Sequence, residues 1–396
     1  MHLPDPARLI ADLAAADRRL VVVAAGGGAL AISHLVTTPG STGVVLAAEV
    51  PSARAAVNAM LGGPQESYCS SRTARRLAVA AWQRASTLER ATDSAELADR
   101  RAVGVAVTGS LRTSRPKRGP HRVCVAVQTL GVTEVADLEL EKEARSRDEE
   151  EALAAALVID VLARAVGLPH AVGHGIAEWL RPGEEVIRDR VEPPEAWREL
   201  VSGARRVVPA GRATGSPVGG GLVFPGSFDP LHEGHRLMAR IAEEIAERPL
   251  DWELSIRNVD KPFLDYVELR ERTARFAAER LWLTHAPTFL EKLDVFPKST
   301  FVMGADTYVR LGDPRYYGGS SAAAEAAVAT IAARARGLMV FGRVRDGVFV
   351  DASQLQVPEP LREIAYFVSP REFRLDISST DLRRRELERR GQPCDA

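Results

Sequence analysis

A ten-residue stretch from Gly226 to His235 combines two histidines with glycines and reads Gly-Ser-Phe-Asp-Pro-Leu-His-Glu-Gly-His. It lies between a short apolar run, 221–224, and a segment with apolar residues at helical spacing, so it is expected to join a buried strand to an amphipathic helix. The start of a helix offers unpaired N–H groups and the positive end of the dipole to an anion. His232 and His235 can donate ring N–H bonds to phosphate and, when protonated, add positive charge. The stretch therefore predicts a loop that handles a triphosphate.

The same ten residues resemble the signature of the HxGH nucleotidylyltransferase superfamily, which joins a nucleoside triphosphate to a phosphorylated acceptor. A fortuitous histidine pair in a surface loop is the alternative, which a match of this length disfavours. The resemblance implies that His232 and His235 are catalytic. It also implies nucleotide contacts from Gly226, Ser227, Phe228 and Gly234.

Farther along the chain, residues 377–383 read Ile-Ser-Ser-Thr-Asp-Leu-Arg and precede a charged, helix-favouring run. A hydroxyl can cap the helix that follows, and an arginine makes forked hydrogen bonds to phosphate. Alone, the pattern is ordinary helix punctuation. Beside the histidine stretch it resembles the superfamily's ISSTxxR motif, which implies a catalytic Arg383. The nucleotide contacts implied by this motif come from Ile377, Ser378, Ser379 and Thr380.

Between the two motifs, Phe301 to Asp306 is an apolar strand pattern that ends in glycine and an acid, where open α/β sheets bind ligands. Gly304 and Asp306 resemble the Gly-x-Asp of nicotinate and nicotinamide mononucleotide adenylyltransferases, and Asp306 can accept bonds from ribose hydroxyls. That resemblance puts Tyr317 where those enzymes stack a tryptophan on the pyridine ring, with simple packing as the alternative. It puts Lys261 at a phosphate of the acceptor, with a solvated loop lysine as the alternative.

Composition divides the chain into three parts. Residues 1–168 alternate strand-like and helical segments and are expected to form an α/β domain. Glycine and proline accumulate over 169–218, which indicates a linker with short helices. Residues 219–396 alternate strand-like and helical runs, as a Rossmann-like, doubly wound parallel sheet requires. The strand-like runs of this third part are 221–224, 252–259, 282–284, 300–303, 338–341 and 364–368.

The first domain carries a glycine pattern of its own. Gly26, Gly28 and Ala31, with Glu49 about twenty residues on, outline a dinucleotide fingerprint. The region resembles more closely the CinA C-terminal family of nicotinamide-nucleotide amidases. That family's nucleophile motif, Glu-Ser-x-Thr-Gly-Gly, falls here on residues 24–29, which read Ala-Ala-Gly-Gly-Gly-Ala. Alanine cannot attack an amide, so we expect a CinA-like fold without amidase chemistry, which binds a pyridine nucleotide, forms an oligomer interface or stabilises the chain.

Composition also bounds the partners. The formal net charge of −1, from 52 basic and 53 acidic residues, gives no basic footprint for nucleic acid. Three scattered cysteines favour reduced thiols over a disulfide framework or a zinc site. The sequence shows neither a signal-peptide pattern nor an apolar span of ~18 residues. We expect a cytoplasmic protein without nucleic-acid or membrane partners and without metal-ligating residues; a homo-oligomer is left open.

The expected reaction is attack of an acceptor phosphate on the α-phosphorus of ATP, with Mg²⁺ bridging phosphates and pyrophosphate released. Nicotinamide or nicotinate mononucleotide is the preferred acceptor. Other members of the superfamily suggest alternatives, namely a cytidylyltransferase acting on a choline-like phosphate or a phosphopantetheine adenylyltransferase. A protein that binds ATP or a pyridine nucleotide without turnover is the alternative outside enzymology.

Overall fold

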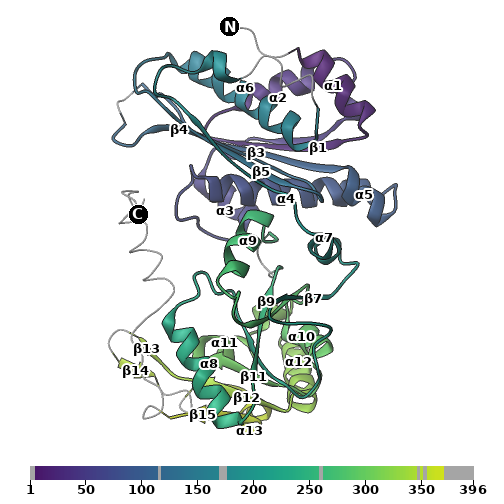
Figure 1. Ribbon diagram of the computed structural model, residues 1–396, viewed down its shortest axis with the longest axis vertical. Helices are drawn as coiled ribbons and strands as arrows, with labels where there is room; N and C mark the ends of the chain where they lie inside the picture. The colour runs from purple at the N-terminus through teal and green to yellow at the C-terminus, as the bar shows by residue number, and fades with distance from the viewer. Residues whose placement is uncertain are drawn as a thin grey trace. The chain divides into compact units, whose positions relative to one another are not determined.

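The computed structural model describes residues 5–114, 117–168, 176–257, 262–345, 348–350 and 355–369. It divides into two compact units (Figure 1). The first unit contains the described residues up to Arg198 together with 262–268, and the second contains 199–257 and the described residues from Leu269 onward.

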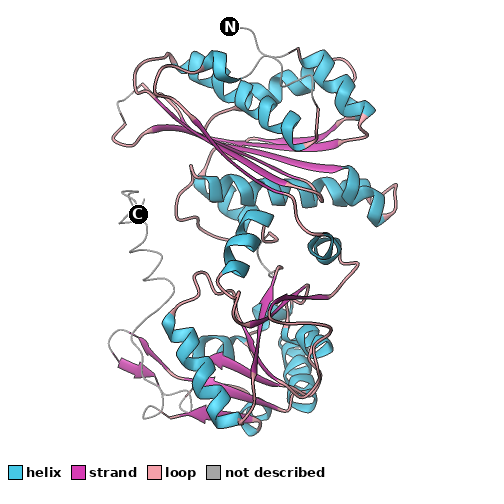
Figure 2. Cartoon of the chain, in the orientation of Figure 1, coloured by secondary structure: helices cyan, strands magenta, loops and turns pink. Residues whose placement is uncertain are grey.

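In the described part of the first unit, six strands form a mixed sheet in the order β2-β1-β3-β4-β5-β6. β1 is parallel to β2 and β3, and the remaining neighbours are antiparallel. The strands are β1 (Arg19–Ala25), β2 (Val45–Glu49), β3 (Ala102–Ser110), β4 (His121–Gln128), β5 (Thr133–Leu140) and β6 (Val186–Val191). Both faces of this sheet are covered by helices, which explains why β1, β3 and β4 are almost entirely apolar and buried (Figure 2).

Helices lie on both sides of this sheet (Figure 1). One side carries α1 (Pro6–Ala15), α2 (Ala29–Thr37) and α6 (Arg147–Ala165), and the other carries α3 (Arg54–Leu61), α4 (Ser71–Glu89) and α5 (Ala95–Arg101). A capping box fixes the start of α6, because Ser146 and Glu149 each bond the other's backbone N–H. Short elements in and beside this unit are η1 (Ser41–Gly43), η2 (Ile176–Trp179) and α7 (Glu195–Ser202).

In the described part of the second unit, seven strands form a sheet in the order β15-β12-β11-β8-β9-β10-β7. All are parallel to their neighbours except β7, which runs antiparallel to β10. Apart from β7, the order along the sheet is the doubly wound order of a Rossmann-like fold, as predicted. The strands are β7 (Val207–Gly211), β8 (Leu222–Pro225), β9 (Leu250–Ser255), β10 (Arg280–Thr284), β11 (Thr300–Gly304), β12 (Gly337–Phe341) and β15 (Ala365–Val368).

Helices connect these strands and lie on both faces of the sheet (Figure 2). They are α8 (Glu233–Ala246), α9 (Tyr266–Ala274), α10 (Phe289–Val295), α11 (Ala305–Arg310), η3 (Pro314–Tyr317), α12 (Ser321–Arg334) and α13 (Glu359–Glu363). A small hairpin of β13 (Arg343–Arg345) and β14 (Val348–Val350) follows β12. In the part of the chain that is described, no helix is long and apolar enough to cross a membrane.

The stretch rich in glycine and proline contributes to both sheets. β6 forms an edge of the first sheet and β7 forms an edge of the second, so residues 169–218 contain strands as well as the short helices expected there. The chain also returns to the first unit after β9, because residues 262–268 are part of that unit.

Candidate functional site

The candidate site lies where the strand order of the second unit reverses. β8 and β11 are neighbours, and the chain continues from β8 towards β9 and from β11 towards β12, in opposite directions along the sheet. Ligands of doubly wound sheets bind at the carboxyl ends of the strands at such a point. Residues 226–235, called the histidine loop below, leave the end of β8, and Gly304 and Asp306 leave the end of β11. The fold therefore brings the two motifs to one edge.

An aromatic cluster holds the histidine loop to the sheet. The N–H of Gly226 donates to the carbonyl of Glu253 on β9 at 3.0 Å, and Phe228 adopts a positive φ of 45°. The Phe228 ring is 2% exposed, and its centroid lies 5.2–5.4 Å from three other rings. Those rings belong to Phe224, Trp252 and Phe276. Because this ring is buried, any nucleotide contact by Phe228 has to come from its backbone, whereas Ser227 is exposed.

A methyl group at position 226 is expected to destabilise the loop. A Cβ on Gly226 would lie 2.6 Å from the ring of Phe228, which the surrounding rings prevent from moving away. We expect Gly226→Ala to lower the free energy of unfolding by about 1–3 kcal/mol, as overpacking does. Gly304→Ala is the matched control, because a Cβ there has no atom within 4 Å. Equal loss in both variants, measured by urea unfolding, would contradict this account.

The two histidines lie at the start of α8. His232 is the N-cap residue, and Gly234 and His235 are in the first turn, with Gly234 buried. The imidazole rings of His232 and His235 are stacked, with centroids 3.7 Å apart and planes inclined by 25°. The backbone N–H of His232 donates to Nδ1 of His235 at 3.4 Å. Since Nδ1 is the acceptor, the proton of a neutral His235 resides on Nε2, which is then a hydrogen-bond donor.

Burial keeps both rings neutral. Desolvation and the neighbouring His232 lower the pKa of His235 from the ordinary value of 6.5 to about 3. Desolvation also lowers the pKa of His232. In the ligand-free protein at pH 7, the pair therefore offers neutral hydrogen-bond donors to a phosphate rather than the full positive charge of imidazolium.

This burial makes stability depend on pH. Between about pH 6.5 and 3, an unfolded chain protonates His235 while the native protein does not, so stability falls as the pH decreases through this range. The slope is at most about 1.4 kcal/mol per pH unit, or about 2 kcal/mol between pH 6.5 and 5. In urea unfolding, His235→Asn should remove the part of the pH-dependent loss of stability that comes from His235. An unchanged pH dependence in the variant would mean that His235 is accessible to protons in the native state.

The residues that follow β11 form the second part of the candidate site, opposite the histidine loop in the strand order. Gly304 is the N-cap residue of α11, and Asp306 is exposed in its first turn. Tyr317 lies in η3 and is half-buried, and its hydroxyl donates to the carbonyl of Leu311 at 2.8 Å. Because the hydroxyl hydrogen bond is made within the protein, Tyr317 would contact a ligand through its aromatic ring. Lys261 and residues 377–383, with Arg383, lie outside the described residues.

One contributor to the site is not among the predicted site residues. Arg272 of α9 is 6% exposed and donates to the carbonyl of Ser227 at 2.6 Å. Its guanidinium also lies 3.4 Å from the carboxylate of Asp229. Both partners belong to the histidine loop. From sequence alone, this arginine is one of several on a helix that reads as scaffold.

In the first unit, the glycines between β1 and α2 are explained by packing. Gly26 and Gly28 have positive φ angles. A Cβ on Gly26 would lie 2.3 Å from the carbonyl oxygen of Gly109, and a Cβ on Gly28 would lie 2.7 Å from the side chain of Val107. At the start of α2, the N–H of Leu30 donates to a carboxylate oxygen of Glu151 at 3.1 Å. The carboxylate of Glu151 thus occupies a backbone N–H at the start of α2 that the pyrophosphate of a bound dinucleotide would need as a hydrogen-bond donor.

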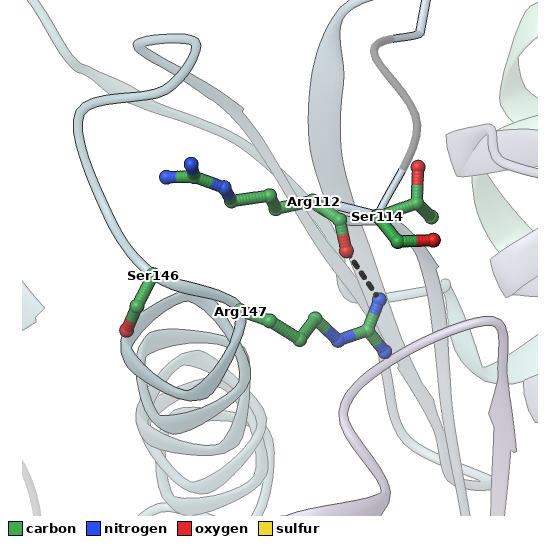
Figure 3. A pocket seen from close by; sticks show the side chains of 5 residues that line it. Arg112, Ser114, Ser146 and Arg147 are labelled. Carbon is green, nitrogen blue, oxygen red and sulfur yellow. Dashed lines mark hydrogen bonds between the residues drawn. The ribbon is translucent and has the colours of Figure 1, made fainter.

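Beside this loop is an open pocket of about 590 Å³, lined by Arg112, Thr113, Ser114, Ser146 and Arg147 (Figure 3). The guanidinium of Arg147 donates to the carbonyls of Arg112 at 3.2 Å and Gly26 at 3.3 Å. The guanidinium of Arg112 donates to the carbonyl of Arg145 at 2.7 Å. Arg147 also forms an ion pair with Glu151 at 3.4 Å. The two guanidinium groups, together with the hydroxyl groups of the lining, are suited to an anion such as a phosphate monoester.

Comparison with known structures gives weak similarities for the amino-terminal part. One is a CinA superfamily protein from Escherichia coli, with 20% identity over 40% of this chain and 87% of that chain and a TM-score of 0.33. Another is the competence/damage inducible protein CihA from Agrobacterium tumefaciens, with 22% identity over 42% and 98% of the two chains and a TM-score of 0.32. No curated protein matches the chain significantly.

The second unit has a match at the level of sequence. Residues 223–385, which begin in β8 and include the histidine loop, Gly304 and Asp306, match the family described as Cytidylyltransferase-like. The match covers most of the second unit, whose sheet has the strand order of a Rossmann-like fold.

Proposed function

We propose that the second unit transfers a nucleotidyl group, AMP from ATP in the preferred form, to a phosphorylated acceptor and releases pyrophosphate. The observation that carries this proposal is the histidine loop at the point of strand reversal, with His232 and His235 stacked at the start of α8. Nucleotidyl transfer depends on positioning and on donors aimed at phosphate oxygens. The match of residues 223–385 to the Cytidylyltransferase-like family supports the same class of reaction.

The proposed step is a direct displacement. An oxygen of the acceptor phosphate attacks the α-phosphorus, the bond from that phosphorus to the bridging oxygen breaks, and pyrophosphate leaves with the electron pair. No general base is required, because the attacking group is already an anion. The Nε2–H of His235 donates to an oxygen that gains negative charge, and the N–H groups of α8 add to this stabilisation.

Magnesium enters this reaction as the ATP complex, in which it offsets phosphate charge. The exposed carboxylate of Asp306 is proposed to accept hydrogen bonds from the ribose hydroxyls. Arg383 and residues 377–380 are proposed to bind the triphosphate on the strength of their resemblance to the superfamily motif.

The finer proposal is that the acceptor is nicotinamide or nicotinate mononucleotide. It is supported by the Gly-x-Asp of Gly304 and Asp306 and by Tyr317, whose half-buried ring lies on η3 after the same strand. Lys261 is proposed to contact the acceptor phosphate. CTP with a choline-like phosphate and ATP with phosphopantetheine are the competing pairs.

Pyrophosphate release tests the proposal. ATP or CTP is offered with Mg²⁺ and each of four acceptors: nicotinamide mononucleotide, its acid, a choline-like phosphate and phosphopantetheine. We expect release with ATP and a pyridine mononucleotide that depends on His235 and is unaffected by His34→Asn, a matched substitution on α2 of the first unit. Release with another pair would change the substrate assignment. Tight ATP binding without release from any pair would favour a non-catalytic nucleotide-binding role.

A second function is proposed for the pocket of the first unit, namely binding of a phosphate-bearing ligand without amide hydrolysis. The supporting observation is the combination of Arg112 and Arg147 with hydroxyl groups beside a loop whose residues 24–29 carry no nucleophile. Calorimetric titration with nicotinamide mononucleotide should show binding that is weakened about tenfold or more in Arg147→Gln, without formation of the acid. Equal binding in both proteins would exclude this pocket as the site.

A further inference from the structure

Helix α9 belongs to both compact units. Its first three residues, Tyr266 to Glu268, are part of the first unit together with the segment that precedes them, and the second unit resumes at Leu269. The helix is one continuous piece of chain, and its two ends make different contacts.

The first turn of α9 is built into the core of the first unit. Tyr266 is fully buried, its backbone N–H donates to Oγ1 of Thr133 at 3.0 Å, and its hydroxyl donates to the carbonyl of Leu130 at 2.8 Å. Burial raises the pKa of Tyr266, so the hydroxyl remains a donor. Phe263, in the preceding segment, contacts the ring of Trp82 on α4 edge to face, with centroids 6.5 Å apart. Hydrogen bonds and ring packing therefore hold this segment in the first unit.

Ion pairs of two buried carboxylates fix the same turn. Asp265 is 2% exposed and lies 3.1 Å from the guanidinium of Arg75, and Glu268 is 5% exposed and lies 3.0 Å from that of Arg72. Asp265 also accepts a bond from the N–H of Glu268 at 2.9 Å, which caps the start of the helix. Both arginines are on α4, so α4 and β5 together determine where α9 begins.

The last turn of α9 holds the histidine loop. Arg272, six residues after Tyr266, reaches the carbonyl of Ser227 and the carboxylate of Asp229 with a side chain that is only 7% exposed. Six residues of helix span about 9 Å. Phe228, between the two partners of Arg272, packs against His235 with ring centroids 5.2 Å apart. A shift of Arg272 would therefore be transmitted to the catalytic histidine.

We propose that Arg272 is a positioning residue for the transferase reaction. The proposal rests on the function proposed above. Arg272 acts through the carbonyl of Ser227, the carboxylate of Asp229 and the ring of Phe228 that lies between them, rather than on the substrate itself.

Kinetics test the role of Arg272. We expect Arg272→Met to lower kcat at least tenfold while changing the dissociation constant of ATP less than threefold, because reaction tolerates misplacement far less than binding does. Arg272→Lys should recover part of kcat, since a lysine can still donate to the carbonyl of Ser227. Equal changes in kcat and ATP binding, or no recovery with lysine, would overturn the positioning role.

Hydrogen exchange tests the hold of Arg272 on the histidine loop without relying on activity, so it remains decisive if no nucleotidyl transfer is found. Arg275→Met, at an exposed position just after α9, is the matched control. We expect Arg272→Met, but not Arg275→Met, to speed exchange of the amides of residues 226–235 at least threefold. Unchanged exchange of these amides in Arg272→Met would overturn the proposal.

Discussion

Replacing His235 by asparagine is expected to lower kcat for pyrophosphate release by about 10²- to 10³-fold, the loss found when a preorganised donor to a developing oxyanion is removed. The oxygen of an asparagine side chain can still accept the bond that His232 N–H donates to Nδ1. The donor at the position of Nε2 is lost. The substitution therefore separates the chemical role of the ring from its role in shaping the loop.

Two comparisons make this result interpretable. The dissociation constant of ATP should change far less than kcat, because the donor acts on charge that develops in the transition state. Glutamine at 235, whose amide nitrogen can approach the position of Nε2, should retain more activity than asparagine. A kcat for His235→Asn within threefold of the wild type would contradict the proposed role and leave His232 as the principal donor.

The inner parallel strands of the second unit were predictable because they are mostly buried and carry apolar residues at successive or alternate positions. β8 is buried at all four positions and β9 at five of six. Two edge strands, β6 and β7, were not recognised, whereas β15, an edge strand of the second sheet, lies within the predicted run 364–368. β6 carries charges at three of its six positions, and β7 contains Pro209, both common at sheet edges. β6 and β7 each have one neighbour in their sheet and are mostly not buried, and their sequences lack a continuous apolar run.

The site was predictable to the extent that it is local. Gly226 to His235 are contiguous, and their position between a strand and a helix follows from the flanking pattern. The low pKa of His235 and the hydrogen bond from Arg272 to Ser227 depend on residues far apart in the sequence that pack around these side chains. The spacing of residues within a motif does not predict such packing. The burial of residues 262–268 in the first unit is likewise a long-range feature. Sequence thus located the donors but not what holds them.

A buried ion pair under the histidine loop leads to the second large effect. Glu253 of β9 is 0% exposed and Lys292 of α10 is 7% exposed. The ammonium donates to the two carboxylate oxygens at 2.8 and 2.9 Å and to the carbonyl of Ala286 at 2.8 Å. Thr284 donates to the same carboxylate. Since the carbonyl of Glu253 also accepts from Gly226, this pair supports the first residue of the loop.

Lys292→Met preserves the length and much of the volume of the side chain but leaves the carboxylate of Glu253 buried without its cation. We expect a loss of about 3–5 kcal/mol in the stability of the second unit, because an uncompensated buried charge is far more costly than the absence of the pair. The free energy of opening is measured by hydrogen exchange of the β9 amides, which reports on this unit alone.

The double variant Glu253→Leu with Lys292→Met distinguishes the cost of an orphaned charge from simple loss of packing. Removing both partners leaves no charge to desolvate, so we expect the double variant to recover most of the stability lost in Lys292→Met. A double variant as unstable as the single one would mean that the position of the Glu253 side chain, rather than its charge, supports the loop. The hydrogen bonds from Gly226 and Thr284 to Glu253 are consistent with such a role. In that case both variants should also release pyrophosphate more slowly, because the first residue of the histidine loop is hydrogen-bonded to Glu253 of β9.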